Sequence, residues 1–104
     1  MFKINGVDWD IKKVSYNHPK VRRPNGEYTL GSCDEETLTI YISEAVPYEK
    51  LKKVLCHELT HAAMFSYNVY MTIDQEELVA DLIATYGEEI IDVTNRIFTK
   101  IRGR

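Results

Sequence analysis

The sequence predicts an α+β fold. In this fold a small N-terminal antiparallel sheet packs against a helix in the middle of the chain, which carries the candidate site, and against a second, C-terminal helix. Two observations lead to this prediction. Up to about residue 43, apolar residues alternate with polar ones, as in strands with one buried face. After Pro47, apolar residues instead recur at intervals of three and four, as in helices. The 104 residues suit one domain, 1–104, and contain neither repeats nor a linker.

The N-terminal part predicts two hairpins. Phe2 and Ile4 alternate with polar residues before Asn5-Gly6, a dipeptide typical of tight hairpin turns, and Val7 begins a second alternating segment. Residues 17–27 are rich in Pro, Asn and Gly, which indicates a surface loop. We expect another pair of strands at 28–32 and 37–42, joined by a turn at 33–36.

The C-terminal part predicts two helices. The first runs from Pro47, as the first helical residue, to about Tyr67, with one apolar stripe. The second has Asp74 as its N-cap, and the periodic pattern continues or restarts beyond Gly87 to residue 101. The apolar stripe of the first helix comprises Leu51, Leu55, Leu59 and Ala62, and that of the second comprises Leu78, Val79, Leu82, Ile83, Tyr86 and Ile90.

Composition excludes several classes of function. The formal net charge of −3 argues against nucleic acid as a main partner. The first residues contain no long apolar run, so neither a signal peptide nor a membrane partner is expected. A cytoplasmic location follows as the default expectation, and Cys33 and Cys56 are then expected to be free thiols.

The segment His57-Glu58-Leu59-Thr60-His61 carries the clearest chemical signal. Residues four apart on a helix point the same way, so His57 and His61 can offer two imidazoles to one zinc ion. Glu58 is placed to take a proton from a metal-bound water without binding the ion itself. Two histidines on an amphipathic helix can also be ordinary surface residues, but the apolar neighbours of this segment favour a metal site.

A catalytic zinc ion usually has three protein ligands, and the second predicted helix offers the third. If the helices are antiparallel, Glu77 can reach the histidines, and Asp81 one turn later can accept the outer N–H of a ligating histidine. Two alternatives stay open at this point. Glu76 could replace Glu77 as ligand, or Glu77 could serve only as the capping-box partner of Asp74.

Residues 54–62, Val-Leu-Cys-His-Glu-Leu-Thr-His-Ala, together with Glu77-Leu-Val-Ala-Asp81, resemble the gluzincin zinc peptidases. The small size and the strand at 37–42 are more similar to the minimal ImmA/IrrE-like metallopeptidases, often encoded by phages. The resemblance covers about residues 37–87. It implies a minimal zincin fold and one Zn²⁺ per chain on His57, His61 and Glu77. It also implies Glu58 as catalytic base, Asp81 behind a histidine, and substrate paired to the edge of the strand at 37–42.

The expected function is therefore zinc-dependent hydrolysis of peptide bonds in a protein or peptide substrate. A second hypothesis is a catalytically idle, zinc-stabilised domain that acts as a protein-binding module. The sequence does not specify the oligomeric state. A donor for the oxyanion of the tetrahedral intermediate is also required, and Tyr67, Tyr70 and His18 are candidates by residue type only, with His18 expected to be exposed.

Overall fold

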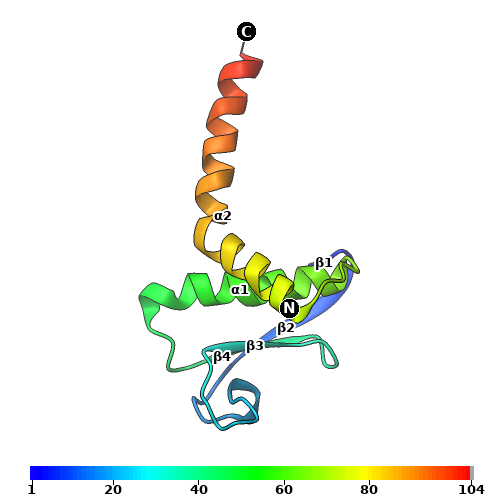
Figure 1. Ribbon diagram of the computed structural model, residues 1–104, viewed down its shortest axis with the longest axis vertical. Helices are drawn as coiled ribbons and strands as arrows, with labels where there is room; N and C mark the ends of the chain where they lie inside the picture. Colours follow the sequence, from blue (N-terminus) through cyan, green and yellow to red (C-terminus); the bar gives the residue numbers. More distant parts are fainter. Residues whose placement is uncertain (104) are drawn as a thin grey trace.

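The structure is a computed structural model that describes residues 1–103, and it has the expected α+β architecture. Helix α1 (Tyr48–Ser66) lies across one face of a four-stranded sheet, and the loop at 15–30 lies on the other side (Figure 1). Helix α2 (Ile73–Arg102) begins beside α1 and then projects away from the sheet (Figure 1). None of the helices among residues 1–103 combines the length and the apolar character needed to cross a bilayer.

The predicted hairpin at Asn5-Gly6 is confirmed. Strands β1 (Phe2–Ile4) and β2 (Val7–Val14) pair antiparallel, and both turn residues take the positive φ that this tight turn requires, 49° at Asn5 and 76° at Gly6. The following loop contains one short 3₁₀ helix, Pro19–Val21, whose Val21 is fully buried.

The expectation of a wholly antiparallel sheet is wrong. The strand order is β1-β2-β4-β3, and β2 pairs in parallel with β4 (Thr39–Ser43), so the sheet is mixed. The loop at 15–30 carries the chain across the sheet before β3 (Gly31–Asp34) returns antiparallel into β4. Strand spacing along a sequence does not reveal such a crossover, because the order in space depends on where the long loop ends.

The second hairpin is also shifted relative to its prediction. Cys33 and Asp34, expected in the turn, belong to β3, and the turn lies at residues 35–38. Leu38 has a positive φ of 52°, and the carboxylate of Asp34 accepts the backbone N–H of Glu36. A side-chain bond of this kind stabilises a turn that begins at Asp34.

The core lies between the sheet and α1. Trp9, Ile40, Ile42 and Ala62 are buried there, and the predicted α1 stripe of Leu51, Leu55 and Leu59 packs against them. The indole N–H of Trp9 donates to the Ser66 hydroxyl at 2.8 Å, so the one polar atom of this side chain is satisfied in the core. This bond ties β2 to the C-terminal end of α1.

Both helix starts differ from the predicted ones. Pro47 is the N-cap of α1, outside the helix, because its ψ of 145° is extended. Thr72, and not Asp74, caps α2: its hydroxyl accepts the N–H of Gln75, and the Gln75 side chain accepts the N–H of Thr72. This reciprocal capping box removes the proposed structural role of Glu77 as the N3 partner of Asp74.

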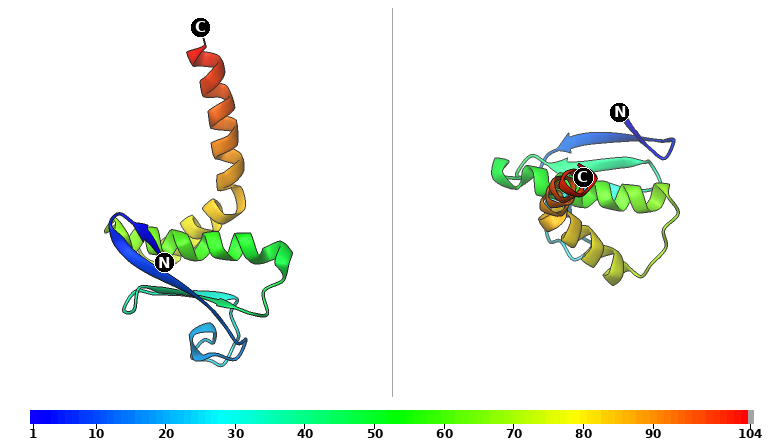
Figure 2. Two further views of the ribbon diagram at one scale, coloured as in Figure 1. Left: turned by 180° about the vertical axis from the view of Figure 1, so that it is seen from behind. Right: turned by 90° about the horizontal axis from the view of Figure 1, so that it is seen from above.

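Helix α2 continues through Gly87 without a break, but its two parts have different surroundings. We call residues 73–82 the proximal part and residues 83–102 the distal part. The proximal part lies against α1, whereas the distal part extends well beyond the sheet and α1 (Figure 2). The predicted apolar stripe of α2 is largely exposed, with Leu78 at 69% and Ile90 at 53% of full exposure.

Candidate metal centre

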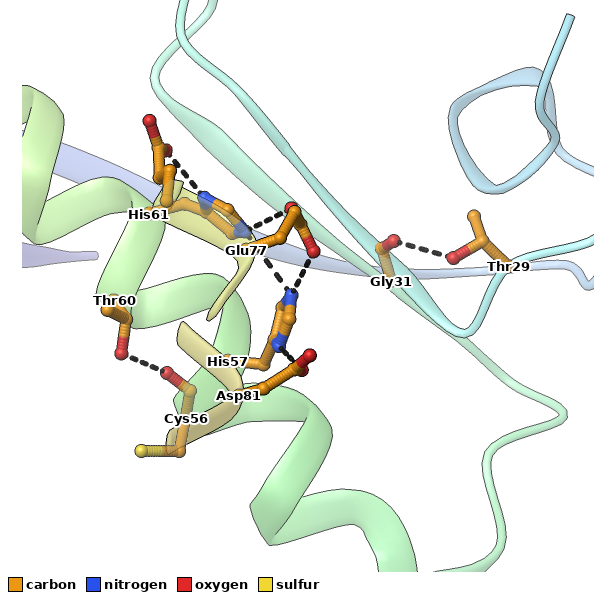
Figure 3. A network of polar contacts seen from close by, with 9 residues as sticks. Thr29, Gly31, Cys56, His57, Thr60, His61, Glu77 and Asp81 are labelled. Carbon is orange, nitrogen blue, oxygen red and sulfur yellow. Dashed lines mark hydrogen bonds and ion pairs between the residues drawn. The ribbon is translucent and has the colours of Figure 1, made fainter. Parts of the chain in front are cut away.

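The two histidines of α1 and the carboxylates of proximal α2 converge (Figure 3). Nε2 of His57 lies 3.2 Å from Nε2 of His61, as expected for residues one helical turn apart. The Glu77 carboxylate lies against both rings, with Oε1 2.9 Å from His61 and Oε2 3.2 Å from His57. One donor atom from each of these three residues therefore faces a common point.

The outer nitrogen of each ring has its own carboxylate partner. Nδ1 of His57 lies 3.0 Å from Asp81, and Nδ1 of His61 lies 2.6 Å from Glu76. A carboxylate only accepts hydrogen bonds, so each neutral ring carries its hydrogen on Nδ1 and presents a lone pair at Nε2. Three electron-rich groups, the two Nε2 atoms and the Glu77 carboxylate, then face one another with no donor between them.

Such a cluster requires a positive charge, either a proton or a cation. Two ligands about 2.0–2.1 Å from a tetrahedral zinc ion lie about 3.3 Å apart. The Nε2–Nε2 distance of 3.2 Å and the two nitrogen–oxygen distances of 2.9 and 3.2 Å are close to that value. Two imidazoles with one carboxylate are also a donor set that zinc favours. The residues present therefore fit a zinc ion.

The charges around His61 affect its titration. Burial lowers its pKa, but the hydrogen bond to Glu76 and the negative charges of Glu77 and Glu58 outweigh that effect and raise the pKa above the ordinary value for histidine. A proton on His61 and a cation at Nε2 would therefore compete for the same excess of negative charge. A divalent ion would displace that proton.

Glu58 is buried, with 8% of its surface exposed, and it lies in the same cleft as the histidines. Burial raises the pKa of its carboxyl group, and the positive charges of His57 and His61 oppose this only in part. It packs closely under β3: a Cβ atom added at Gly31 would lie 3.2 Å from its Cγ and 3.1 Å from the carbonyl oxygen of Tyr41. Only glycine leaves this carboxylate its present position without displacing its neighbours.

The cleft, of ≈ 670 Å³, runs along the outer edge of β3. One wall carries the metal-centre residues and the other carries Arg22 and Arg23 of the long loop. β3 is an edge strand, whereas β4 pairs on both sides, with β2 and with β3. The expectation that substrate pairs with the strand at 37–42 is therefore wrong, because that edge is already occupied.

The remaining candidates from the sequence lie elsewhere. Tyr67 and Tyr70 are exposed, at 58% and 85%, and neither lines the cleft. His18 is half-buried rather than exposed, since its ring stacks on Tyr41 with a centroid distance of 5.6 Å. Both cysteines are free, as predicted. Burial and the nearby charge of Glu58 raise the pKa of the Cys33 thiol to about 12, so it lines the cleft as a neutral group.

Sequence reasoning considered Glu76 only as a substitute for Glu77 and missed its contact with His61. A signal was available, because each ligating histidine needs an acceptor for its outer N–H and Asp81 can serve only one of the two. Gly31 and Cys33 carried no comparable signal. Comparison of the chain with protein-family models, with curated proteins and with solved structures found no match.

Proposed function

We propose that this chain is a zinc-dependent peptidase that hydrolyses peptide bonds with Glu58 as general base. The observation that carries the proposal is the convergence of His57, His61 and Glu77 beside a buried carboxylate in one cleft. A structural zinc site needs four closed ligands and no base. Here three donors converge, and Glu58 faces the same cleft without belonging to the donor set.

A bound zinc ion would lower the pKa of a coordinated water to roughly 7 and polarise the scissile carbonyl. The chain's own residues supply the rest. Glu58 accepts the proton of the attacking water and passes it to the departing amine nitrogen. Its burial helps, because a carboxylate with a raised pKa is a stronger base than one in water.

The outer carboxylates keep the histidines ready to bind the ion. Glu76 and Asp81 hold the hydrogens on Nδ1, so that both Nε2 atoms remain electron-pair donors. The edge of β3 can align an extended peptide along the cleft by backbone pairing, because no other strand covers that edge and residues 31–33 line the cleft. An extended backbone passing β3 would bring one peptide bond close to Glu58 and the histidines.

Substitution Glu58→Gln tests the proposal, because it keeps the shape of the side chain but removes the base. We expect the variant to bind one zinc ion per chain as tightly as the parent, while the cleavage rate falls by about 10²–10⁴-fold. Zinc-loaded parent and variant would each be incubated with a library of peptides from a digested proteome, and new termini would be identified by mass spectrometry.

Equal cleavage by the parent and by Glu58→Gln would contradict the role of Glu58. A zinc-loaded parent that cleaves nothing in the library would favour the alternative function, an idle zinc-stabilised binding module. Failure of the parent to bind zinc at all would contradict both functions.

A further inference from the structure

The distal part of α2 presents an apolar face that no other segment of residues 1–103 covers. Five apolar residues along the middle of this face, which we call its core positions, are exposed to between 36% and 54%. Three further apolar residues beside them are exposed to between 56% and 69%. An exposed apolar surface of this length marks an interaction site in a soluble protein. The core positions are Ile83, Tyr86, Ile90, Val93 and Ile97, and the three flanking residues are Ile91, Phe98 and Ile101.

The spacing of the core positions is that of a coiled coil. Ile83, Ile90 and Ile97 repeat every seven residues, and Tyr86 and Val93 follow the first two by three residues. This is the a and d pattern with which one helix packs against another. The side of the helix that faces the body is different: there Glu88 pairs with Lys52 of α1 at 2.6 Å. Glu88 lies roughly 160° around the helix from Ile90, so the apolar face points away from the rest of the chain.

The charges of the distal part are separated along its length. Residues 88–95 contain Glu88, Glu89 and Asp92 and no basic residue, whereas residues 96–103 contain Arg96, Lys100 and Arg102 and no acidic one. The helix dipole favours acidic residues in the first turn and basic residues in the last. It does not account for three acidic residues in the middle of a helix that begins at Ile73. Glu89 and Arg96 lie seven residues apart on the same side of the apolar positions, so a reversed second copy can bring Glu89 of one helix beside Arg96 of the other.

We propose that the distal part of α2 binds the same segment of a second copy of this chain, in antiparallel orientation. In this orientation each helix presents both members of one charge pair to the other, one acidic and one basic. With Ile90 opposite Val93 and Tyr86 opposite Ile97 of the second copy, Glu89 lies beside Arg96 of that copy, and symmetry forms the pair twice. Positions that flank the apolar seam set the orientation of such helices through these pairs.

The parallel arrangement is disfavoured by the same residues. The parallel arrangement would place Lys100 against Lys100 at a seam position, whereas the antiparallel register places Lys100 opposite Ile83. The parallel arrangement would also form no Glu89–Arg96 pair. The distal part projects from the body, so a second copy can approach it (Figure 2). The proposal is independent of zinc and of the proposed peptidase activity.

The first test is the mass of the full chain by sedimentation equilibrium over a concentration series, without added metal. We expect a monomer–dimer equilibrium. The double variant Ile90→Glu/Ile97→Glu should be monomeric, with circular dichroism showing retained helix. Asn95→Glu adds a negative charge on the opposite face and should dimerise like the parent. A parent chain that stays monomeric, or a double variant that still dimerises, would overturn the proposal.

The second test addresses orientation. Glu89→Arg alone places Arg against Arg in the antiparallel pair, and Arg96→Glu alone places Glu against Glu, so each should raise the dissociation constant by roughly tenfold. An equimolar mixture of the two variants should associate again, because each heterodimer restores both opposite-charge pairs. Single variants that dimerise like the parent, or a mixture that associates no better than its components, would refute the antiparallel arrangement.

Discussion

The proximal and distal parts of α2 belong to one continuous helix but differ in what surrounds them. The proximal part places Glu76, Glu77 and Asp81 against the histidines of α1, and only Ala80 is fully buried there. The distal part carries most of the apolar side chains of the helix and leaves them exposed. Polar contacts thus position one part, while the apolar periodicity of the other lacks a counterpart within residues 1–103. Helical periodicity predicts the element equally well in both parts, but not what the element contacts.

The largest effect should come from removing a proposed ligand from the candidate metal centre. His61→Ala should weaken zinc binding by more than about a hundredfold, because the loss of a direct ligand exceeds the effect of its outer partners. His18→Ala is the matched control, since this histidine stacks on Tyr41 on the other side of the sheet. Competition with a chromophoric chelator gives both affinities. Equal losses in the two variants would contradict the site.

The outer carboxylates should have the next largest effect. Glu76→Ala and Asp81→Ala should each weaken zinc binding by about 10–100-fold, because the ring then loses the group that orients it. We expect the larger loss for Glu76, whose contact is shorter, at 2.6 Å against 3.0 Å, and whose side chain is less exposed, at 24% against 67%.

Asp92→Ala removes a carboxylate from the distal part of the same helix and is the control for this pair. Its zinc affinity should match that of the parent. A comparable loss in Asp92→Ala would mean that the net charge of α2, and not the individual contacts, determines the affinity.

The pH dependence follows from the raised pKa of His61. A ligating imidazole must be neutral, so protons compete with zinc at every pH below that pKa. Affinity should therefore rise with pH through the raised pKa, by about tenfold per pH unit for one released proton, and level off above it. In Glu76→Ala the rise should end at a lower pH, because the main group that raises the pKa is gone. An unchanged profile in that variant would contradict the assignment.

Some features of the fold and of the candidate site can be predicted from the sequence, and others cannot. The α+β class, the Asn5-Gly6 hairpin and the His57–His61 pair depend on neighbouring residues, so short patterns predict them. The parallel pairing of β2 with β4 and the choice of Glu77 over Glu76 depend on how distant segments meet. That information is absent from any short pattern. For the same reason, the periodicity of α2 predicts an apolar stripe but does not predict that the stripe is exposed.

The smallest expected effects are those of replacing two glycines, Gly31 near the candidate site and Gly87 in distal α2, by alanine. Gly31→Ala introduces a methyl group 3.1–3.2 Å from Tyr41, Val54 and Glu58, where the backbone oxygen cannot give way, so it should destabilise the fold by roughly 1–2 kcal/mol. Gly87→Ala meets only the Ile83 side chain, at 3.3 Å. Ile83 is 40% exposed and free to change rotamer, and alanine favours helix over glycine, so this change should stabilise by up to about 1 kcal/mol.

Denaturant unfolding of both variants at one fixed protein concentration measures the two effects, and the opposite signs are the informative result. Both substitutions add the same methyl group, so only the surroundings differ. Destabilisation by Gly87→Ala would mean that Ile83 is held in place by something that the isolated chain lacks. The second copy proposed above would then be the first partner to test, because Ile83 belongs to the apolar seam. Repeating the measurement at several protein concentrations would show whether the penalty grows as the dimer forms.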